Sequence, residues 1–459
     1  MAELAAAGNP PIFTAGYRRW LLGLLLIVWS FNFVDRFVLA TQAQAIKLEF
    51  GLSDFQLGLL QGLGFALLYA VLGLPVARLA EHRSRVAIIG VAVLVWTVAV
   101  ASCGLVGSFW LLFVLRVGVG AGDAGFMTPV GSLIADHFAP KERGSAFSII
   151  NLAAPVGSAI GAVGGGWIAQ DYGWRTAFIV AGLPGVILAL LVFGTLREPP
   201  RAHAEGGLRQ GERPPPVLDV FRLLFAKPTF RHLLVGVGLS ALGMNAIGQF
   251  LPAFIVRSYH MGLRDAGVLF ATVSFFSLGI GILLGGYGGD RLVGRDARWQ
   301  AWLASVGVLL AGPLYIAAFL QPSPIGATCF LLFAAIALFL YVAPSQAMVQ
   351  NMTPPLARAS ASYIFAFLLA AIGAGFGPTL VGLCSDYFAR TSFTAGDFHG
   401  LCPAAAGASP DLAAACADAS AIGLRDALIV SAALFVWASL HFYLAARTVR
   451  QDVRQIAPA

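Results

Sequence analysis

The stretch WSFNFVDRFVLA, residues Trp29 to Ala40, predicts a membrane-spanning helix that carries charge. It lies inside an apolar run from Trp20 to Ile46, yet Asp35 and Arg36 stand side by side within it. An ionised side chain near the middle of a bilayer is costly, so such residues usually face a polar cavity and have charged partners. The pair therefore marks either an ion pair that specifies helix packing or a binding site for a substrate or a proton.

A second apolar run, Phe109 to Ala135, carries a matching set of charges. It contains LRVGVGAGDAGF, in which Arg116 and Asp123 are seven residues apart. Seven residues are close to two helical turns, so both side chains project from one face. Adjacent residues such as Asp35 and Arg36 diverge by about 100° and cannot share a partner. We therefore predict two separate pairs, Asp35 with Arg116 and Arg36 with Asp123.

The composition predicts a polytopic membrane protein. Of 459 residues, 58% are hydrophobic and 11% are charged, and the mean hydropathy is +0.81. Apolar runs near 20 residues recur along the chain, and they are expected to be helices because a lipid-exposed backbone must satisfy its own hydrogen bonds. The net charge of +7 does not indicate nucleic acid, since most Lys and Arg residues fall in alternate loops, which marks those loops as cytoplasmic.

We predict an all-α fold with twelve transmembrane helices in two six-helix halves. The amino-terminal residues lack the basic start and apolar core of a signal peptide, so both ends are expected in the cytoplasm. The predicted regions are a tail at 1–18, a first half at 19–196, a linker at 197–229, a second half at 230–447 with a periplasmic loop at 390–422, and a tail at 448–459. The predicted spans are 19–46, 55–79, 86–106, 109–135, 144–169, 174–196, 230–257, 265–289, 298–320, 324–351, 358–388 and 423–447.

Short repeats indicate that the two halves are copies of one unit. GLSD at Gly51 to Asp54 returns as GLRD at Gly262 to Asp265. PKERGSA around Arg143 returns as PPLARASA around Arg358, and GWRTAFIVA returns as GLRDALIVS. Such a duplication predicts a pseudo-twofold axis along the membrane normal, with the binding site between the halves near the midplane.

Polar residues on the predicted spans are candidates for lining a cavity, although each alone is as well explained by a hydrogen bond between helices. They are Asn32, Asn151, Asn245, Gln249, Tyr341 and Tyr363, with Gln346. The second half holds no embedded charged pair comparable with the first, but it is rich in aromatic residues. We infer that an amphiphile places its head at Arg36 and its tail along Phe250, Phe254, Phe275, Phe276, Phe365, Phe367 and Phe376.

Charged loops at the cytoplasmic face suggest a gate. We predict that acidic side chains there pair with arginines when the inside is closed, and that opening breaks the pairs. The residues are Glu81, Arg83, Arg85 and Arg143 in the first half, and Asp290, Arg291, Arg295 and Arg358 in the second.

Several kinds of function are disfavoured. The sequence has no GxxxxGK[ST] phosphate-binding loop, so transport driven by this chain's own ATP hydrolysis is not expected. No nucleophile, base and orienting group stand at a recognisable spacing, so we expect no catalytic residues. The histidines at 137, 232 and 260 lie far apart in the sequence, so no metal site is predicted. No cofactor is predicted either, and protons are expected to be the coupling ion.

Longer motifs resemble the major facilitator superfamily. PVARLAEHRSR at Pro75 to Arg85 and GGYGGDRLVGRDAR at Gly285 to Arg298 are similar to its paired loop motifs. RVGVGAGDAG and PVGSAIGAVGGGW resemble its fourth-helix and fifth-helix motifs, whose glycines we expect to serve close helix packing. Within that superfamily, NFVDR and the stretch after GLSD resemble Spinster-type transporters, a group associated with lysophospholipids and sphingosine phosphates.

The resemblance has two departures and one competitor. The fourth-helix acid of the family is usually Glu and here is Asp123, and the usual Asp of the first loop motif is Glu81. NFVDR together with a fourth-helix Arg and acid also resembles the anion:cation symporters, which move organic carboxylates with protons. An uncoupled facilitator or a receptor-like sensor with the same fold is a third possibility, because fold alone does not establish function.

The resemblance implies proton-coupled transport of an amphiphilic anion by alternating access. In this hypothesis Asp123 and Asp35 exchange protons, Arg116 supports Asp35, and Arg36 holds the substrate's anionic head in place of a carboxylate. We expect a monomer in a bacterial inner membrane, with the lipid bilayer and the substrate as partners. Cys402 and Cys416 lie in the predicted periplasmic loop and are expected to form a disulfide there, with two free thiols as the alternative.

Overall fold

The computed structural model describes residues 13–138, 140–200, 215–354, 357–402 and 409–454. Nearly all of the described residues are helical, and no strand occurs among them. Twelve helices or helix pairs in this part of the chain are long and apolar enough to cross a membrane. Eleven of them agree closely with the predicted spans, and the all-α, twelve-span prediction is confirmed.

Contacts within the chain divide it into two compact units, which we call unit 1 and unit 2. Unit 1 comprises Met1–Gln42 and Gly64–Glu212, and unit 2 comprises Ala43–Leu63 and Arg213–Ala459. The division differs from the predicted halves at residues 43–63, which group with unit 2. The cause is the close packing of this segment against unit 2 that is described below.

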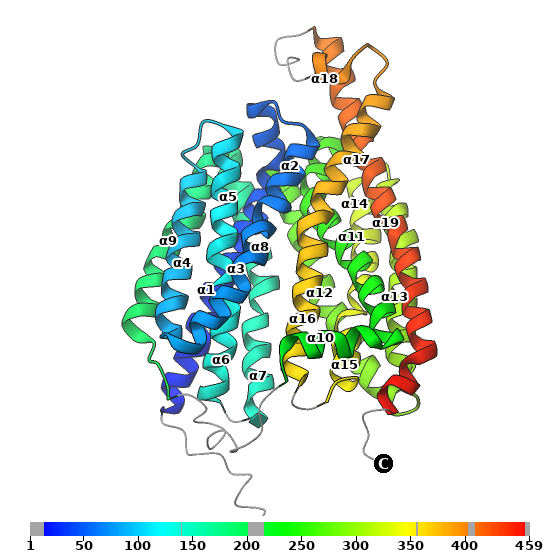
Figure 1. Cartoon of the computed structure of the whole chain (residues 1–459). Helices are drawn as coiled ribbons and strands as arrows, with labels where there is room; N and C mark the ends of the chain where they lie inside the picture. Colours follow the sequence, from blue (N-terminus) through cyan, green and yellow to red (C-terminus); the bar gives the residue numbers. More distant parts are fainter. Residues whose placement is uncertain (1–12, 139, 201–214, 355–356, 403–408, 455–459) are drawn as a thin grey trace, which may run out of the picture. The chain divides into compact units, whose positions relative to one another are not determined.

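Unit 1 is a bundle of helices that run along one common direction (Figure 1). Polar caps begin several of them: the hydroxyls of Ser84 and Ser108 accept hydrogen bonds from the first turns of two helices. Gly173, with a φ of 84°, makes the tight connection that L side chains rarely adopt. The helices are α1 (Ala15–Phe50), α3 (Leu63–His82), α4 (Arg85–Cys103), α5 (Phe109–Ala124), α6 (Met127–His137), α7 (Pro140–Asn151), α8 (Ala153–Tyr172) and α9 (Trp174–Thr195).

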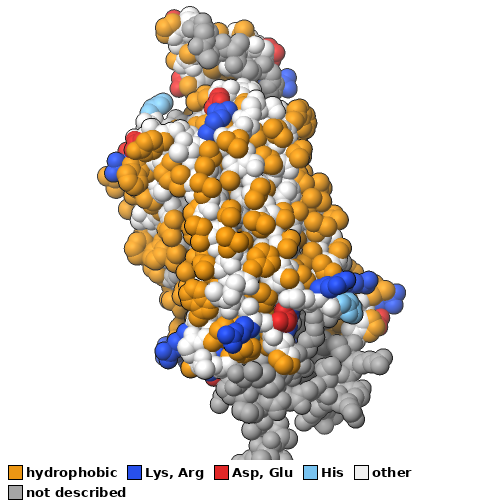
Figure 2. All heavy atoms as spheres, turned by 90° about the vertical axis from the view of Figure 1, so that its left-hand side faces the viewer, with side chains coloured by type: hydrophobic (Ala, Val, Ile, Leu, Met, Phe, Trp, Pro, Cys, Tyr) orange, Lys and Arg blue, Asp and Glu red, His pale blue; other side chains and the backbone are white. Residues whose placement is uncertain are grey.

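The lipid-facing character of unit 1 is visible on its outer surface. Figure 2 shows a broad band of hydrophobic side chains with charged side chains gathered toward its two ends. Large apolar side chains that are exposed in this unit include Val91, Val98, Ile187 and Leu190. An exposed apolar band of this kind is stable only in a hydrocarbon environment.

Unit 2 contains the remaining helices, and some of them lie outside the predicted spans. The last part of α1 joins α2 (Asp54–Gln61), α10 (Val217–Ala226), α11 (Pro228–Tyr259), α12 (Leu263–Val293), α13 (Trp299–Phe319), α14 (Pro324–Phe339), α15 (Val342–Asn351), α16 (Arg358–Ala370), a π-helical segment (Ala371–Phe376), α17 (Gly377–Ser392), α18 (Phe398–Leu401) and α19 (Pro410–Arg454). The helix α10 lies within the predicted linker, and α19 begins inside the predicted loop 390–422. Its first turns, PDLAAACADAS, are rich in alanine and form helix despite being too polar for a membrane span.

Glycines bring α2 against α17 in unit 2. A Cβ atom added at Gly58 would lie 2.4 Å from the carbonyl oxygen of Pro378, and one at Gly382 would lie 2.1 Å from that of Asp54. Only glycine permits backbones to approach so closely. This packing explains why residues 43–63 belong with unit 2 although they precede most of unit 1 in sequence.

Candidate functional site

The first predicted pair, Asp35 on α1 and Arg116 on α5, is confirmed. The Arg116 Nη1 atom lies 3.0 Å from Asp35 Oδ1 and 2.8 Å from Asp35 Oδ2. Both side chains are buried in unit 1, with exposed fractions of 2% for Arg116 and 3% for Asp35. Each charge is thereby neutralised by its partner inside the helix bundle.

The second predicted pair, Arg36 with Asp123, is confirmed as well and includes a third residue. Arg36 Nη2 donates to Asp123 Oδ2 at 2.5 Å, and Asn32 Nδ2 donates to Asp123 Oδ1 at 2.7 Å. The Asp123 side chain is fully buried, whereas 24% of the Arg36 side chain is exposed. Asp123 is thus held by two donors from α1, and Arg36 is the member of the pair that other molecules can reach.

Two aromatic rings hold the Arg36 guanidinium in place. Its central carbon lies 4.2 Å from the centre of the Phe65 ring on α3 and 5.6 Å from that of Phe33 on α1. A guanidinium over an aromatic face is attracted by the ring quadrupole, which adds to the ion pair with Asp123. Phe65 was not among the predicted site residues. The structure packs its backbone against Gly120, where an added Cβ atom would lie 2.0 Å from the Phe65 carbonyl oxygen.

Arg36 and Asn32 retain hydrogen-bonding capacity in this arrangement. The buried Arg36 Nε and Asn32 Oδ1 atoms have no partner in the part of the chain that the structure describes. Buried polar atoms without partners are uncommon in folded proteins and often mark places where water or a ligand binds. A guanidinium with a free edge, fixed between a carboxylate and a ring, is suited to binding an oxyanion.

The glycine-rich α8 determines where α1 lies. A Cβ atom at Gly157 would be 2.2 Å from the Ser30 carbonyl oxygen, and one at Gly161 would be 2.6 Å from that of Val34. These contacts confirm that the glycines of the fifth span serve close packing. They flank the turn of α1 that bears Asn32, Asp35 and Arg36.

The other predicted substrate-binding residues lie on helices of both units, and their role in binding stays a prediction. Asn151 is exposed at the end of α7 in unit 1. In unit 2, Asn245 Nδ2 donates to the Ala241 carbonyl at 2.8 Å, and Gln249 is half-buried one turn further along α11. Tyr341 is 2% exposed and its ring centre lies 5.9 Å from that of Phe442, so it fills a helix interface. The Tyr363 side chain lies outside the described residues.

The predicted aromatic surface for a substrate tail is wrong for three of its members. Phe250, Phe254 and Phe365 are at most 3% exposed, because they pack between the helices of unit 2. The Phe254 ring, for example, meets the Phe319 ring edge-on at 5.2 Å. Phe275, Phe276 and Phe376 are exposed, and Phe367 is half-buried.

Arg85, one of the predicted gating residues, is buried in unit 1 among partners that sequence analysis missed. Its guanidinium donates to Asp136, to Glu198 Oε1 at 2.6 Å and to Ser132 Oγ at 2.8 Å. The Glu198 carboxylate also accepts from the backbone of Val86 at the start of α4. Burial raises the pKa of Glu198, but the bonds from Arg85 and Val86 together outweigh burial and lower this pKa below its ordinary value.

Two of the remaining gating residues, Arg143 and Arg358, make equivalent hydrogen bonds in the two units. Arg143 Nε donates to the Phe138 carbonyl at 3.2 Å, and Arg358 Nε donates to the Thr353 carbonyl at 3.3 Å. Each arginine thus binds the carbonyl five residues before it, as expected for copies of one unit. Arg291 is exposed. The side chains of Glu81 and Asp290 lie outside the described residues.

A second charged cluster in unit 2 was not predicted. The Asp54 carboxylate accepts from Arg257 Nη1 and Nη2, each at 2.7 Å, from Lys47 Nζ at 2.8 Å and from Ser385 Oγ at 2.6 Å. The Asp386 carboxylate accepts from the backbone amides of Asp54 and Phe55 at the start of α2. We call this set the Asp54 cluster. The GLSD motif identified Asp54 only as part of a helix start, because its partners are up to 332 residues away in sequence.

The two cysteines of the predicted loop are joined in the structure. Cys402, just after α18, forms a disulfide with Cys416 on α19, and their Cα atoms are 5.5 Å apart. The bond fixes α18 against the first turns of α19, where Phe393, Phe398 and Ala419 form a small apolar cluster.

The chain is similar to known proteins over most of its length. The family model of the Major Facilitator Superfamily matches residues 24–378. The chain is 33% identical over 373 residues to an MFS-type efflux pump of Mycolicibacterium smegmatis, covering 80% of this chain and 85% of that protein. It is 28% identical over 285 residues to a probable L-galactonate transporter of Escherichia coli, covering 59% of this chain and 61% of that protein.

A solved structure is similar over nearly the whole chain. It is the crystal structure of a bacterial homolog to the human lysosomal transporter Spinster, in an inward-facing and unoccupied conformation. The TM-score is 0.85 at 31% sequence identity, covering 96% of this chain and 99% of that one.

Proposed function

The chain belongs to the major facilitator superfamily and resembles its Spinster-type transporters, and from this premise we propose that it couples protons to the transport of an amphiphilic anion. It is a multi-pass membrane protein, and its relatives are transporters. The observation that carries the proposal is the ion pair between Arg36 and the buried Asp123 in unit 1. The Arg36 side chain is 24% exposed although it is bound to Asp123. A substrate such as a lysophospholipid or a sphingoid phosphate brings the oxyanion that this guanidinium accepts.

Coupling follows from competition for Arg36. While Arg36 pairs with Asp123, the carboxylate is stabilised in its ionised form. When a phosphate or carboxylate head takes the guanidinium, Asp123 keeps only the amide of Asn32 and binds a proton more readily. Anion binding and proton binding thereby favour each other. The ring of Phe65 keeps the guanidinium in place during the exchange of partners.

The Asp35–Arg116 pair supports this site and is a second candidate for titration. Its two members are nearly inaccessible, so neither reaches a substrate without movement of α1 or α5. Removal of one partner leaves a buried charge uncompensated. Its first role is therefore to hold α1 against α5 at the depth at which Arg36 meets Asp123.

Alternating access requires interactions that hold each side closed in turn. The Asp54 cluster joins the end of α1 and the start of α2 to α11 and α17 through charged hydrogen bonds. We assign it to closure of the side predicted to face outward, which opens when Arg257 and Lys47 leave Asp54. The predicted residues of the opposite gate stay Glu81, Arg85, Arg143, Asp290, Arg291 and Arg358.

Flux through proteoliposomes tests the function. We expect radiolabelled lysophosphatidylglycerol to move faster in vesicles that hold the wild-type protein under a pH gradient than without one. Arg36→Ala should lose transport at least tenfold, and Arg36→Lys should retain part of it, since lysine keeps the charge without the planar fork. Equal flux with and without the gradient would point to an uncoupled facilitator, and no flux at all to a sensor.

A small organic anion is the second candidate, favoured by the similarity to the probable L-galactonate transporter. A galactonate carboxylate fits the same guanidinium but needs no apolar surface. Direct flux decides between the two: labelled lysophosphatidylglycerol should move and labelled galactonate should not if the substrate is an amphiphile, and the reverse should hold if the site serves small anions.

A further inference from the structure

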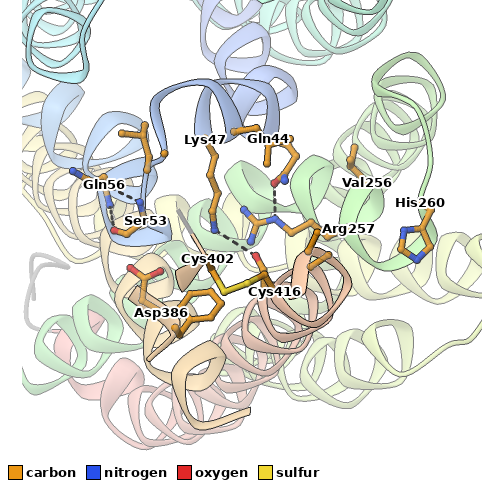
Figure 3. A pocket seen from close by; sticks show the side chains of 17 residues that line it. Gln44, Lys47, Ser53, Gln56, Val256, Arg257, His260, Asp386, Cys402 and Cys416 are labelled. Carbon is orange, nitrogen blue, oxygen red and sulfur yellow. Dashed lines mark hydrogen bonds between the residues drawn. A yellow bond between two sulfur atoms is a disulfide. The ribbon is translucent and has the colours of Figure 1, made fainter. Parts of the chain in front are cut away.

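A cavity of about 580 Å³ lies in unit 2 beside the Asp54 cluster (Figure 3). The end of α1, the turn into α2, the end of α11, and α17 to α19 form its walls. This is a size typical of pockets for small molecules. All the residues that line it belong to unit 2, and none of them is a member of the Arg36 site of unit 1.

One side of this cavity is lined by charged side chains, among them two cations. Lys47 and Arg257 point toward its centre in Figure 3. Both bind Asp54, and the other carboxylate nearby, Asp386, is occupied by the backbone amides at the start of α2. Hydrogen bonds from neutral amides leave the charge of Asp386 in place, so the two cations and the two carboxylates balance in formal charge. What an anion can use here is a donor that the carboxylates do not occupy.

Lys47 also has donor capacity to spare. An ammonium group has three N–H donors. One is directed at Asp54 at 2.8 Å and a second at Ser420 Oγ over a long 3.4 Å. The third has no partner among the described residues, and 14% of the Lys47 side chain is exposed. An oxyanion in the cavity can therefore bind Lys47 without first breaking an existing bond.

The other side of the cavity is apolar. Leu48 and Leu52 from the first helices face Val256 on α11, while Phe398, Ala413 and the Cys402–Cys416 disulfide complete the wall. The disulfide keeps the short α18, and with it Phe398, on the first turns of α19. An ammonium group with an unoccupied donor opposite an apolar wall matches a ligand with an anionic head and a hydrocarbon tail.

We propose that this cavity is a second binding site for amphiphilic anions, at the end of unit 2 that is predicted to face outward. The head binds Lys47 and Arg257, and the tail lies along Leu48, Val256 and Phe398. Since the head competes with Asp54 for both cations, occupancy weakens the Asp54 cluster and favours opening of this side. The inference rests on the proposed function for its ligand class, which is either the transported substrate or a bilayer lipid.

Photo-crosslinking of the full-length protein in detergent tests the proposal. The probe is an alkyl phosphate with a diazirine at the end of its tail, and mass spectrometry maps the labelled residues. We expect labels on the peptides that contain Leu48, Val256 and Phe398. Ala413→Trp fills the cavity without touching the Asp54 cluster and should reduce labelling at least tenfold. Ala414→Trp, the neighbouring exposed position that does not line the cavity, should leave labelling unchanged.

Competitors define the ligand class. Octyl phosphate should suppress labelling, whereas inorganic phosphate and octyltrimethylammonium at the same concentration should not. Suppression by inorganic phosphate alone would overturn the need for a tail, and suppression by the cation would overturn the need for an anionic head. Competition by lysophosphatidylglycerol but not by diacyl phosphatidylglycerol identifies the substrate as the ligand, and the reverse identifies a bilayer lipid.

The Arg36→Ala protein separates this inference from the proposed function. Its labelling in the cavity should equal that of the wild type even though its transport is lost. Labelling lost in Arg36→Ala but retained in Ala413→Trp would place the probe at unit 1 and overturn the second site. Normal transport by Arg36→Ala with unchanged labelling would overturn the proposed function and leave the cavity assignment intact.

Discussion

Asp54 and Asp265 occupy the same place in the GLSD and GLRD repeats, but only one of them is buried. Asp54 is 1% exposed and binds Lys47, Arg257 and Ser385, whereas Asp265 is exposed in the first turn of α12. Asp54→Ala removes the carboxylate that binds the buried Arg257 and the partly buried Lys47, and breaking a buried ion pair costs about 3–5 kcal/mol. Asp265→Ala should change stability by less than about 0.5 kcal/mol. Thermal unfolding of both variants in detergent checks this, and equal effects would contradict the assigned importance of the Asp54 cluster.

Glu198 provides a residue whose charge state affects stability outside the membrane-spanning segments. Its pKa is lowered in the folded protein because the bonds from Arg85 and Val86 outweigh burial. The ionised carboxylate therefore stabilises the fold above its ordinary pKa of about 4.3, and this contribution is lost as the pH falls through the lower, folded pKa. The stability difference between wild type and Glu198→Gln should be full at pH 7 and shrink below about pH 4.3.

The matched control for Glu198 is an exposed acid. Asp265→Asn should show no comparable dependence of its effect on pH, since Asp265 is exposed at the start of α12. Unfolding midpoints measured from pH 7 down to about pH 2.5, below the ordinary pKa of a glutamate, supply both curves. A difference for Glu198→Gln that grows as the pH falls would contradict the role given to its carboxylate.

At the level of helices, the sequence predicted the pairing of α1 with α5 because charge inside an apolar run is informative. A charged side chain inside a membrane span needs a partner of opposite charge. Helical spacing predicted which residues pair: Asp35 with Arg116, and Arg36 with Asp123. Phe65 was missed because one aromatic residue in an apolar helix carries no such signal. The Asp54 cluster was missed because Lys47 and Asp54 lie near a predicted helix end, where charge is ordinary.

The packing of α8 on α1 yields a test with a control in the same helix. Gly157→Ala places a Cβ atom 2.2 Å from the Ser30 carbonyl oxygen, so α1 must shift. Overpacking of this kind costs about 1–3 kcal/mol. Gly164 has no atom within 4 Å of an added Cβ, so Gly164→Ala should be neutral or slightly stabilising. The unfolding temperature and the substrate flux should both fall for Gly157→Ala and not for Gly164→Ala. Unchanged flux in Gly157→Ala would mean that the position of α1 does not control the Arg36 site.

For the whole molecule, hydropathy was sufficient to predict the twelve spans, because a span is set by its length and its apolar character. Hydropathy was insufficient for the placement of residues 43–63, which depends on the contacts of Gly58 and Gly382 with distant backbone. The early start of α19 was missed because helical propensity continues where hydrophobicity ends. The predicted aromatic tail surface failed for Phe250 and Phe254 since composition does not distinguish a ring between helices from one that faces a ligand.

The central claim is that Asp123 carries the coupling proton while Arg36 binds the anion. The most direct measurement compares wild type and Asp123→Asn in proteoliposomes, under a pH gradient and in exchange of labelled for unlabelled lysophosphatidylglycerol without one. We predict that Asp123→Asn folds, still exchanges substrate and loses the acceleration by the gradient, because an amide keeps the hydrogen bond but cannot ionise. Acceleration by the pH gradient that equals the wild-type value in a folded Asp123→Asn protein would contradict the account.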